Sequence, residues 1–250
     1  DLVRAEVAQP LLFADQISLC HALSEYGLTP KAVLGHSGGE VAAACVSGVL
    51  SLDQALNLIH QRSKSQMKLA GRGTMAALQV SAEQAVVGLG ESGFDEISIA
   101  AINSPKSVTI SGPSDQISEF LTYARRIKRW AAVPLKINYP YHSSIQDEIK
   151  DELRLDLDFI QPQECRVPFL SSVTGSELAW AKLGSDYWWD NVRQPVQFMD
   201  AIHTAAASGY RAFLEIGPQP VLTNYVNDSL GEDADSFINT FSFERADTKV

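Results

Sequence analysis

The sequence predicts an α/β fold in which a larger domain is interrupted by a smaller inserted one. Short apolar runs of strand length alternate with segments whose apolar residues recur at helical spacing. A glycine-rich turn at 35–39 follows one such run and precedes a helical pattern. The segment 73–137 has its own strand and helix order, so a chain of 250 residues accommodates a main domain and a companion.

The N-terminal part predicts helices around one short buried strand. Apolar residues recur at helical spacing over 8–26, and Gly27 ends that pattern. The run 32–34 is short and apolar, as in a buried strand. Two helices are expected after the glycine-rich turn, over 40–48 and 52–70.

The inserted segment predicts a β-α-β-β-α-β order, which is the ferredoxin-like arrangement. Its expected strands and helices are strands at 74–80, 97–101, 107–111 and 131–137, and helices at 82–91 and 114–127. We therefore expect a small subdomain over 73–137 and a large subdomain formed by 1–72 and 138–250.

The remaining chain returns to the α/β pattern of the larger domain. The expected elements are helices at 144–153, 184–192, 197–208 and 218–229, and strands at 168–173 and 211–215.

Composition argues against several functional classes. A net charge of −10 argues against broad attraction to nucleic acid. The chain has no apolar run of the length that a membrane span needs. Cys20, Cys45 and Cys165 show neither a disulfide framework nor a metal-ligand spacing. We expect a cytoplasmic protein without a bound metal, and the start at Asp1 rather than Met suggests a piece of a longer chain.

The candidate nucleophile is Ser37, in the G-x-S-x-G pattern of residues 35–39. A turn between a strand and a helix forces the serine into a strained backbone, and Gly35 and Gly39 are expected to leave room for it. The hydroxyl would lie at a helix N-terminus, with the Gly38 N–H as an oxyanion donor. The alternative is a glycine-rich turn with serine capping the helix.

The candidate base is His142, which lies in a polar turn after an apolar strand. His21, His60 and His203 fall on expected helices. His36 adjoins the nucleophile, but its side chain should point away from Ser37. The alternative for His142 is a loop histidine that caps a helix.

Several ordered motifs resemble the malonyl-CoA:acyl carrier protein acyltransferase family, which includes acyltransferase domains of polyketide and fatty-acid synthases. The resemblance covers nearly the whole chain and implies an α/β-hydrolase-like main domain with an inserted ferredoxin-like subdomain. The motifs are Gly35-His36-Ser37-Gly38-Gly39-Glu40, Gln61-Arg62-Ser63, Gly73-Thr74-Met75-Ala76-Ala77, Asn103-Ser104-Pro105, Tyr187-Trp188, Asn191-x-Arg193-x-Pro195-Val196-Gln197-Phe198 and Glu215-Ile216-Gly217-Pro218.

The resemblance implies a role for individual residues. Ser37 and His142 would form and resolve an acyl-enzyme in a ping-pong reaction, and Gln197 would help to orient His142. Arg62 would grip the free carboxylate of the acyl group. The further substrate-binding residues are His36, Tyr139 and Tyr141.

The same resemblance implies the substrates and partners. An acyl group would move from coenzyme A to the phosphopantetheine thiol of an acyl carrier protein, with no bound cofactor and with neighbouring synthase domains as partners. A bulky Tyr141 favours malonyl over methylmalonyl, whereas Gly38 would widen the pocket, so methylmalonyl stays open.

The sequence departs from the family in one respect. Family members have an upstream strand and a Gly-Gln-Gly loop that supplies a second oxyanion donor, and the residues before Ser37 contain no counterpart. Two other functions compete. A serine esterase or thioesterase of the α/β-hydrolase type shares the serine motif, but Arg62 and the insert argue against it. A silent docking domain of a synthase is disfavoured by the presence of Ser37, Arg62 and His142.

Overall fold

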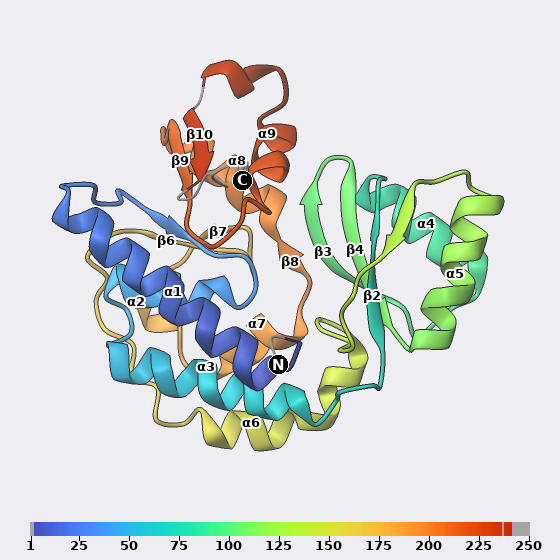
Figure 1. Cartoon of the computed structure of the whole chain (residues 1–250), viewed down its shortest axis with the longest axis horizontal. Helices are drawn as coiled ribbons and strands as arrows, with labels where there is room; N and C mark the ends of the chain where they lie inside the picture. Colours follow the sequence, from blue (N-terminus) through green and yellow to red (C-terminus); the bar gives the residue numbers. More distant parts are fainter. Residues whose placement is uncertain (1–2, 237, 242–250) are drawn as a thin grey trace, which may run out of the picture.

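The computed structural model describes residues 3–236 and 238–241. Figure 1 shows a body of helices on one side, a sheet with two helices on the other, and the C-terminal elements above them. The expected mixed α/β fold with a ferredoxin-like unit is confirmed.

The N-terminal half of the larger body surrounds the short strand β1. Its elements are α1 (Ala5–Glu25), β1 (Val33–Leu34), α2 (Gly39–Ser47) and α3 (Leu52–Met67). Helix α3 begins with a capping box, in which Ser51 and Gln54 bond each other's backbone N–H.

The small sheet of this body has the order β1-β6-β7, with β6 (Phe169–Ser171) and β7 (Ser176–Glu177). Strand β1 runs parallel to β6, with Val33 opposite Phe169. Phe169, Leu58, Leu153 and Trp188 are fully buried in the core that joins this sheet to its helices.

The inserted unit follows the predicted order. It comprises β2 (Thr74–Leu78), α4 (Ala82–Ser92), β3 (Ser98–Ser104), β4 (Ser107–Gly112), α5 (Ser114–Arg126) and β5 (Ala132–Pro134). Its strands lie in the order β5-β2-β4-β3 and pair antiparallel. Helices α4 and α5 pack on this sheet around Leu78, Ile110 and Phe120 (Figure 1).

A strand from outside the insert extends this sheet. After α7 (Ser185–Arg193), the two-residue strand β8 (Val196–Gln197) pairs parallel with β3, with Val196 opposite Ala101. Strand β8 was not predicted, because two residues carry no periodicity. Because the sheet includes residues from both sides of the expected boundary, the division at 73–137 stays a prediction.

The other elements lie along the second half of the chain. They are η1 (Ser144–Ile149), α6 (Lys150–Asp156), η2 (Trp180–Lys182), α8 (Phe198–Ala207), β9 (Ala212–Glu215), α9 (Thr223–Leu230), η3 (Gly231–Ser236) and β10 (Ile238–Phe241). Strand β10, which was not predicted, pairs parallel with β9.

Helix α9 starts at Thr223, later than the 218 that the sequence predicted. The preceding segment contains Pro218 and Pro220, and the Glu215 carboxylate accepts N–H bonds from Leu222 and Thr223. Those bonds cap the first turn and set its start. Over residues 3–236 and 238–241, no helix has both the length and the apolar character needed to cross a membrane.

Candidate active site

Ser37 lies on a strained turn between β1 and α2. Its φ is +53°, in the left-handed region that residues with a Cβ rarely adopt. The turn brings Gly35 so close to the start of α2 that a Cβ there would lie 2.2 Å from the Glu40 nitrogen. Gly35 is therefore required by the turn itself.

The expected matching role for Gly39 is wrong. A Cβ on Gly39 would meet only the Gln16 amide nitrogen, at 3.9 Å. The crowding therefore lies on the strand side of Ser37 alone. Gly38 has φ −56° and is the N-cap residue of α2, and a Cβ on it would lie 3.3 Å from Arg62 Nη1.

Ser37 and His142, 105 positions apart in sequence, form a hydrogen bond. Ser37 Oγ lies 2.7 Å from His142 Nε2, and His142 Nδ1 lies 2.8 Å from the Gln194 carbonyl oxygen. A carbonyl only accepts, so Nδ1 carries the proton and donates to it. Nε2 is then the acceptor for the Ser37 hydroxyl, which is the tautomer that a general base needs.

The carbonyl that orients His142 belongs to Gln194, so the assignment of this role to Gln197 is corrected. Gln197 uses its backbone N–H to bond the Ser172 carbonyl and lies in β8. Pro195 explains the choice of Gln194: the residue before a proline is extended, and Gln194 has ψ 157°. Its carbonyl therefore turns out of α7 and toward the imidazole.

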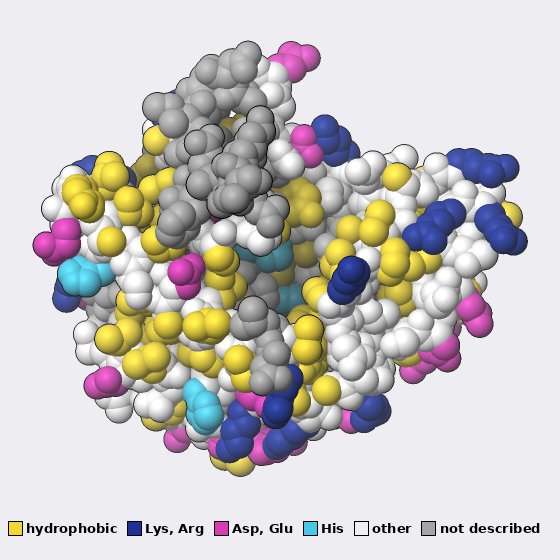
Figure 2. All heavy atoms as spheres, viewed as in Figure 1, with side chains coloured by type: hydrophobic (Ala, Val, Ile, Leu, Met, Phe, Trp, Pro, Cys, Tyr) yellow, Lys and Arg dark blue, Asp and Glu magenta, His cyan; other side chains and the backbone are white. Residues whose placement is uncertain are grey.

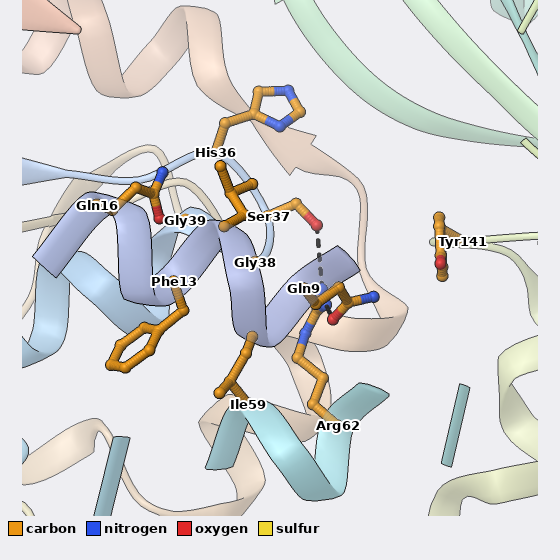
Figure 3. A pocket seen from close by; sticks show the side chains of 11 residues that line it. Gln9, Phe13, Gln16, His36, Ser37, Gly38, Gly39, Ile59, Arg62 and Tyr141 are labelled. Atoms are coloured by element: carbon orange, nitrogen blue, oxygen red, sulfur yellow. Dashed lines mark hydrogen bonds between the residues drawn. The ribbon is translucent and has the colours of Figure 1, made fainter. Parts of the chain in front are cut away.

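Arg62, on α3, is buried and points at Ser37 (Figure 3). Its Nη2 donates to Ser37 Oγ at 3.1 Å and its Nε to Asn191 Oδ1 at 3.3 Å. Its Nη1 donates to the amide oxygens of Gln9 and Gln66 at 2.5 and 3.2 Å. Within the described ranges every acceptor of this guanidinium is neutral, so its charge has no carboxylate partner in contact.

The charge state of these groups follows from their burial. Burial lowers the pKa of Arg62 to about 10, so it stays cationic at neutral pH. The pKa of His142 falls to about 3, first through burial and second through the positive charge of Arg62. The imidazole is therefore neutral and able to accept a proton at neutral pH.

A cavity of about 170 Å³ lies beside Ser37, between the turn and α1. Its lining residues are Gln9, Leu12, Phe13, Gln16, His36, Ser37, Gly38, Gly39, Ile59, Arg62 and Tyr141 (Figure 3). Figure 2 shows a hollow between the two bodies with histidine side chains at its bottom and apolar side chains around it.

Of the expected substrate-binding residues, Tyr141 lines the cavity and Tyr139 does not. Burial raises the pKa of Tyr141 to about 12, so its hydroxyl, which bonds the Gln9 side chain, stays protonated. The Tyr139 ring stacks on that of Tyr141 at 5.2 Å, and its hydroxyl bonds the Ala5 N–H and Met67 Sδ. Tyr139 thus packs against Tyr141 and does not line this cavity, and its contact with substrate stays a prediction.

His36 points away from Ser37, as expected, and connects the turn to the inserted sheet. Its Nε2 lies 2.9 Å from Asn103 Oδ1 at the end of β3, and its ring lies 5.3 Å from Phe198. Burial lowers the pKa of His36, which favours the neutral ring.

Four residues of the site were not predicted from the sequence: Gln9, Gln66, Glu40 and Asn191. Gln66 lies four residues after Arg62, so both share one face of α3. Gln9 shares a face of α1 with Phe13, at the same spacing. For these two residues, an amide side chain on the buried face of a helix is the sequence feature that could have indicated a polar site.

Comparisons with known proteins identify the family of this chain. The family model described as "Acyl transferase domain" matches residues 1–241. The chain belongs to the acyltransferase domain family. It is therefore an acyltransferase, and its predicted resemblance to polyketide synthase acyltransferase domains is confirmed.

Individual relatives give the extent of the likeness. The chain is 39% identical over 230 residues to the spectinabilin polyketide synthase system protein NorA' of Streptomyces orinoci, covering 92% of this chain and 6% of that protein. It is 32% identical to the acyltransferase domain from module 8 of the salinomycin polyketide synthase, with a TM-score of 0.93, covering 98% of this chain and 57% of the other.

A third relative shares the fold. The malonyl CoA-acyl carrier protein transacylase from Clostridium perfringens is 23% identical, with a TM-score of 0.87, covering 98% of this chain and 77% of the other. The chain thus spans only a small part of the synthase chain that it matches and most of this transacylase.

Replacing Gly35 or Gly39 by alanine should have different effects on the free energy of unfolding. Gly35→Ala places a Cβ against the α2 backbone, and we expect it to lower the free energy of unfolding by about 3 kcal/mol or more. Gly39→Ala places a Cβ in a helix at an ordinary contact distance from Gln16, so stability should be unchanged or rise by up to about 1 kcal/mol. Thermal unfolding of both variants measures this, and equal effects would contradict the one-sided crowding.

The pH dependence of Ser37 acylation should reflect the lowered pKa of His142. With p-nitrophenyl acetate as a neutral reagent, the wild-type rate should stay level down to about pH 4. Arg62→Ala removes a positive charge, so the pKa of His142 should rise and the rate should fall at a higher pH than in wild type. Lys64→Ala, exposed on the same helix, is the matched control and should leave the profile unchanged. A wild-type rate that falls near pH 6.5 would contradict this account.

Proposed function

We propose that this domain transfers a carboxylated acyl group, malonyl by preference, from coenzyme A to the phosphopantetheine thiol of an acyl carrier protein. The observation that carries the proposal is a buried guanidinium, Arg62, whose Nη2 lies 3.1 Å from the nucleophile Ser37 and which has only neutral acceptors among the described residues. A dicarboxylic acyl group would bring both the carbonyl that Ser37 attacks and the carboxylate that Arg62 lacks.

The first half-reaction acylates Ser37. His142 Nε2 takes the hydroxyl proton while Ser37 Oγ attacks the thioester carbonyl. The Gly38 N–H, at the start of α2, would donate to the oxyanion. The intermediate collapses with cleavage of the C–S bond, and His142 returns the proton to the leaving sulfur of coenzyme A.

The second half-reaction reverses these roles. The carrier thiol gives its proton to His142 Nε2 and attacks the ester carbonyl. The C–O bond to Ser37 breaks, and the serine oxygen takes the proton back. The Gln194 carbonyl stabilises the imidazolium in both halves because it holds Nδ1–H.

The preference for malonyl rests on the shape of the cavity. Tyr141 lines the cavity with its ring fixed against Tyr139, so an α-methyl group would meet a rigid wall. Gly38 faces Arg62, and its missing side chain leaves room for the guanidinium. One methyl group changes binding by about 1–3 kcal/mol, so methylmalonyl would be a poorer substrate and not an excluded one.

The wider setting is also a proposal. Relatives such as NorA' are synthase chains of which this domain covers 6%, which supports neighbouring domains and an acyl carrier protein as partners. The three free cysteines support a cytoplasmic location, and the acyl transfer needs no bound cofactor. The contribution of an upstream loop to the oxyanion hole stays a prediction.

Transfer to a thiol acceptor tests the proposal against hydrolysis. The domain is incubated with malonyl-CoA and either a phosphopantetheinylated acyl carrier protein or pantetheine. We expect the acceptor to gain a malonyl group in wild type and none in Ser37→Ala. Release of free malonate with no acceptor adduct would support the esterase alternative and overturn the transferase proposal.

Arg62→Ala should lower the preference for malonyl over acetyl by about 10- to 100-fold in kcat/KM, since hydrogen bonds to a charged group are lost. Lys64→Ala removes the same charge from an exposed site on α3 and should keep the wild-type preference. The measurement is the kcat/KM for transfer from each acyl-CoA. An unchanged preference in Arg62→Ala would remove Arg62 from carboxylate recognition.

A further inference from the structure

A buried carboxylate, Glu40, lies near the site but does not contact Arg62. It is the first acid of α2 and is fully buried. Its Oε1 accepts bonds from the Ser172 N–H and hydroxyl, and its Oε2 from the Tyr187 hydroxyl and the Asn191 amide. All four donors are neutral, so Glu40 and Arg62 are two opposite buried charges held by neutral groups.

Asn191, on α7, is the residue between them. Its Oδ1 accepts from Arg62 Nε at 3.3 Å. Its Nδ2 donates to Glu40 Oε2 at 2.8 Å and to the Ser37 carbonyl oxygen at 3.1 Å. One buried amide therefore contacts the candidate carboxylate-binding arginine, the backbone of the nucleophile and the buried acid.

The amide has only one orientation that satisfies these partners. A flipped side chain would turn its oxygen toward the Ser37 carbonyl and the Glu40 carboxylate, which only accept, and its NH₂ toward Arg62, which only donates. Both amide hydrogens and the oxygen are thus committed, and this fixes the Nε edge of Arg62.

We propose that Asn191 is a positioning and specificity residue: it fixes the Nε edge of Arg62 and separates Arg62 from Glu40. The Nη edge then keeps only neutral acceptors, which a substrate carboxylate can displace. This inference rests on the proposed function. A direct Glu40–Arg62 ion pair would be the favourable pairing of two buried charges, and it would occupy the donors that the substrate needs. The Asn191 amide instead bonds each charged group separately and keeps Glu40 out of contact with Arg62.

The arrangement also ties recognition to attack. The Asn191 NH₂ holds the Ser37 carbonyl, and its oxygen holds the arginine that contacts Ser37 Oγ. When an acyl group binds with its carboxylate on Arg62 and its thioester carbonyl next to Ser37 Oγ, these two groups are therefore held at a fixed separation. A rigid separation of this kind favours acyl groups whose carboxylate lies at the matching distance from the thioester.

The test compares malonyl with acetyl transfer to pantetheine in variants of this network. Asn191→Ala should lower the malonyl-over-acetyl ratio of kcat/KM by about tenfold, mainly through a higher KM for malonyl-CoA. Asn191→Asp keeps the volume but gives Arg62 an internal carboxylate, so the ratio should fall here too. Tyr187→Phe is the matched control, because it removes another neutral donor from Glu40 without touching Arg62, and it should keep the ratio while lowering the melting temperature.

The outcomes separate the possible explanations. In Arg62→Ala, adding Asn191→Ala should lower the ratio no further, because the residue that it positions is gone. A wild-type ratio in either folded Asn191 variant, or an equal loss in Tyr187→Phe, would overturn the role of Asn191. If wild type itself shows no preference for malonyl, the proposed function fails instead, whatever the variants do.

Discussion

The buried positive charge of Arg62 contacts no carboxylate among the residues that the structure describes, and the rest of the site depends on this constraint. Burying a cation costs free energy unless its donors are satisfied. Gln9, Gln66, Asn191 and Ser37 provide only neutral acceptors to Arg62. The positive charge of Arg62 is therefore left to be neutralised by an anionic ligand. It lies next to Ser37, which is already hydrogen-bonded to His142. Burial first, and then the same charge, lower the pKa of His142 and keep the imidazole neutral.

The segment from the middle of α7 to β8 holds several residues of the site in place. Between the middle of α7 and β8, Asn191 holds Arg62 and the Ser37 carbonyl, Gln194 holds His142, and Gln197 bonds Ser172 through its backbone. Strand β8 then pairs with β3 of the inserted sheet. The proposed carboxylate recognition, the proposed proton transfer and the contact between the two bodies therefore depend on a single segment, so a shift in α7 would disturb all of them.

Much of this could be predicted from sequence, and the limits have physical reasons. The motif around Ser37, the ferredoxin-like order and the pairing of Ser37 with His142 depend on local patterns or on family resemblance. Gln194 was missed because the carbonyl that matters is set by Pro195 and by the exit of the chain from α7, not by side-chain type. Tyr139 and Tyr141 are near neighbours in one motif, yet only the fold shows that one lines the cavity and the other supports it. Asn191 and Glu40 are distant in sequence, and their role depends on a buried network that no spacing reveals.

The central claim is that the unpaired charge of Arg62 selects the acyl group that reaches Ser37. The most direct measurement is a competition in which the domain meets equal concentrations of malonyl-CoA and acetyl-CoA without an acceptor, followed by intact mass and peptide mapping. The account predicts a malonyl ester on Ser37 in at least about tenfold excess over the acetyl ester. Malonyl gains hydrogen bonds to the charged Arg62 that acetyl cannot make, and such bonds favour binding by about that factor or more. Equal amounts of the two esters, or acylation at another residue, would contradict it.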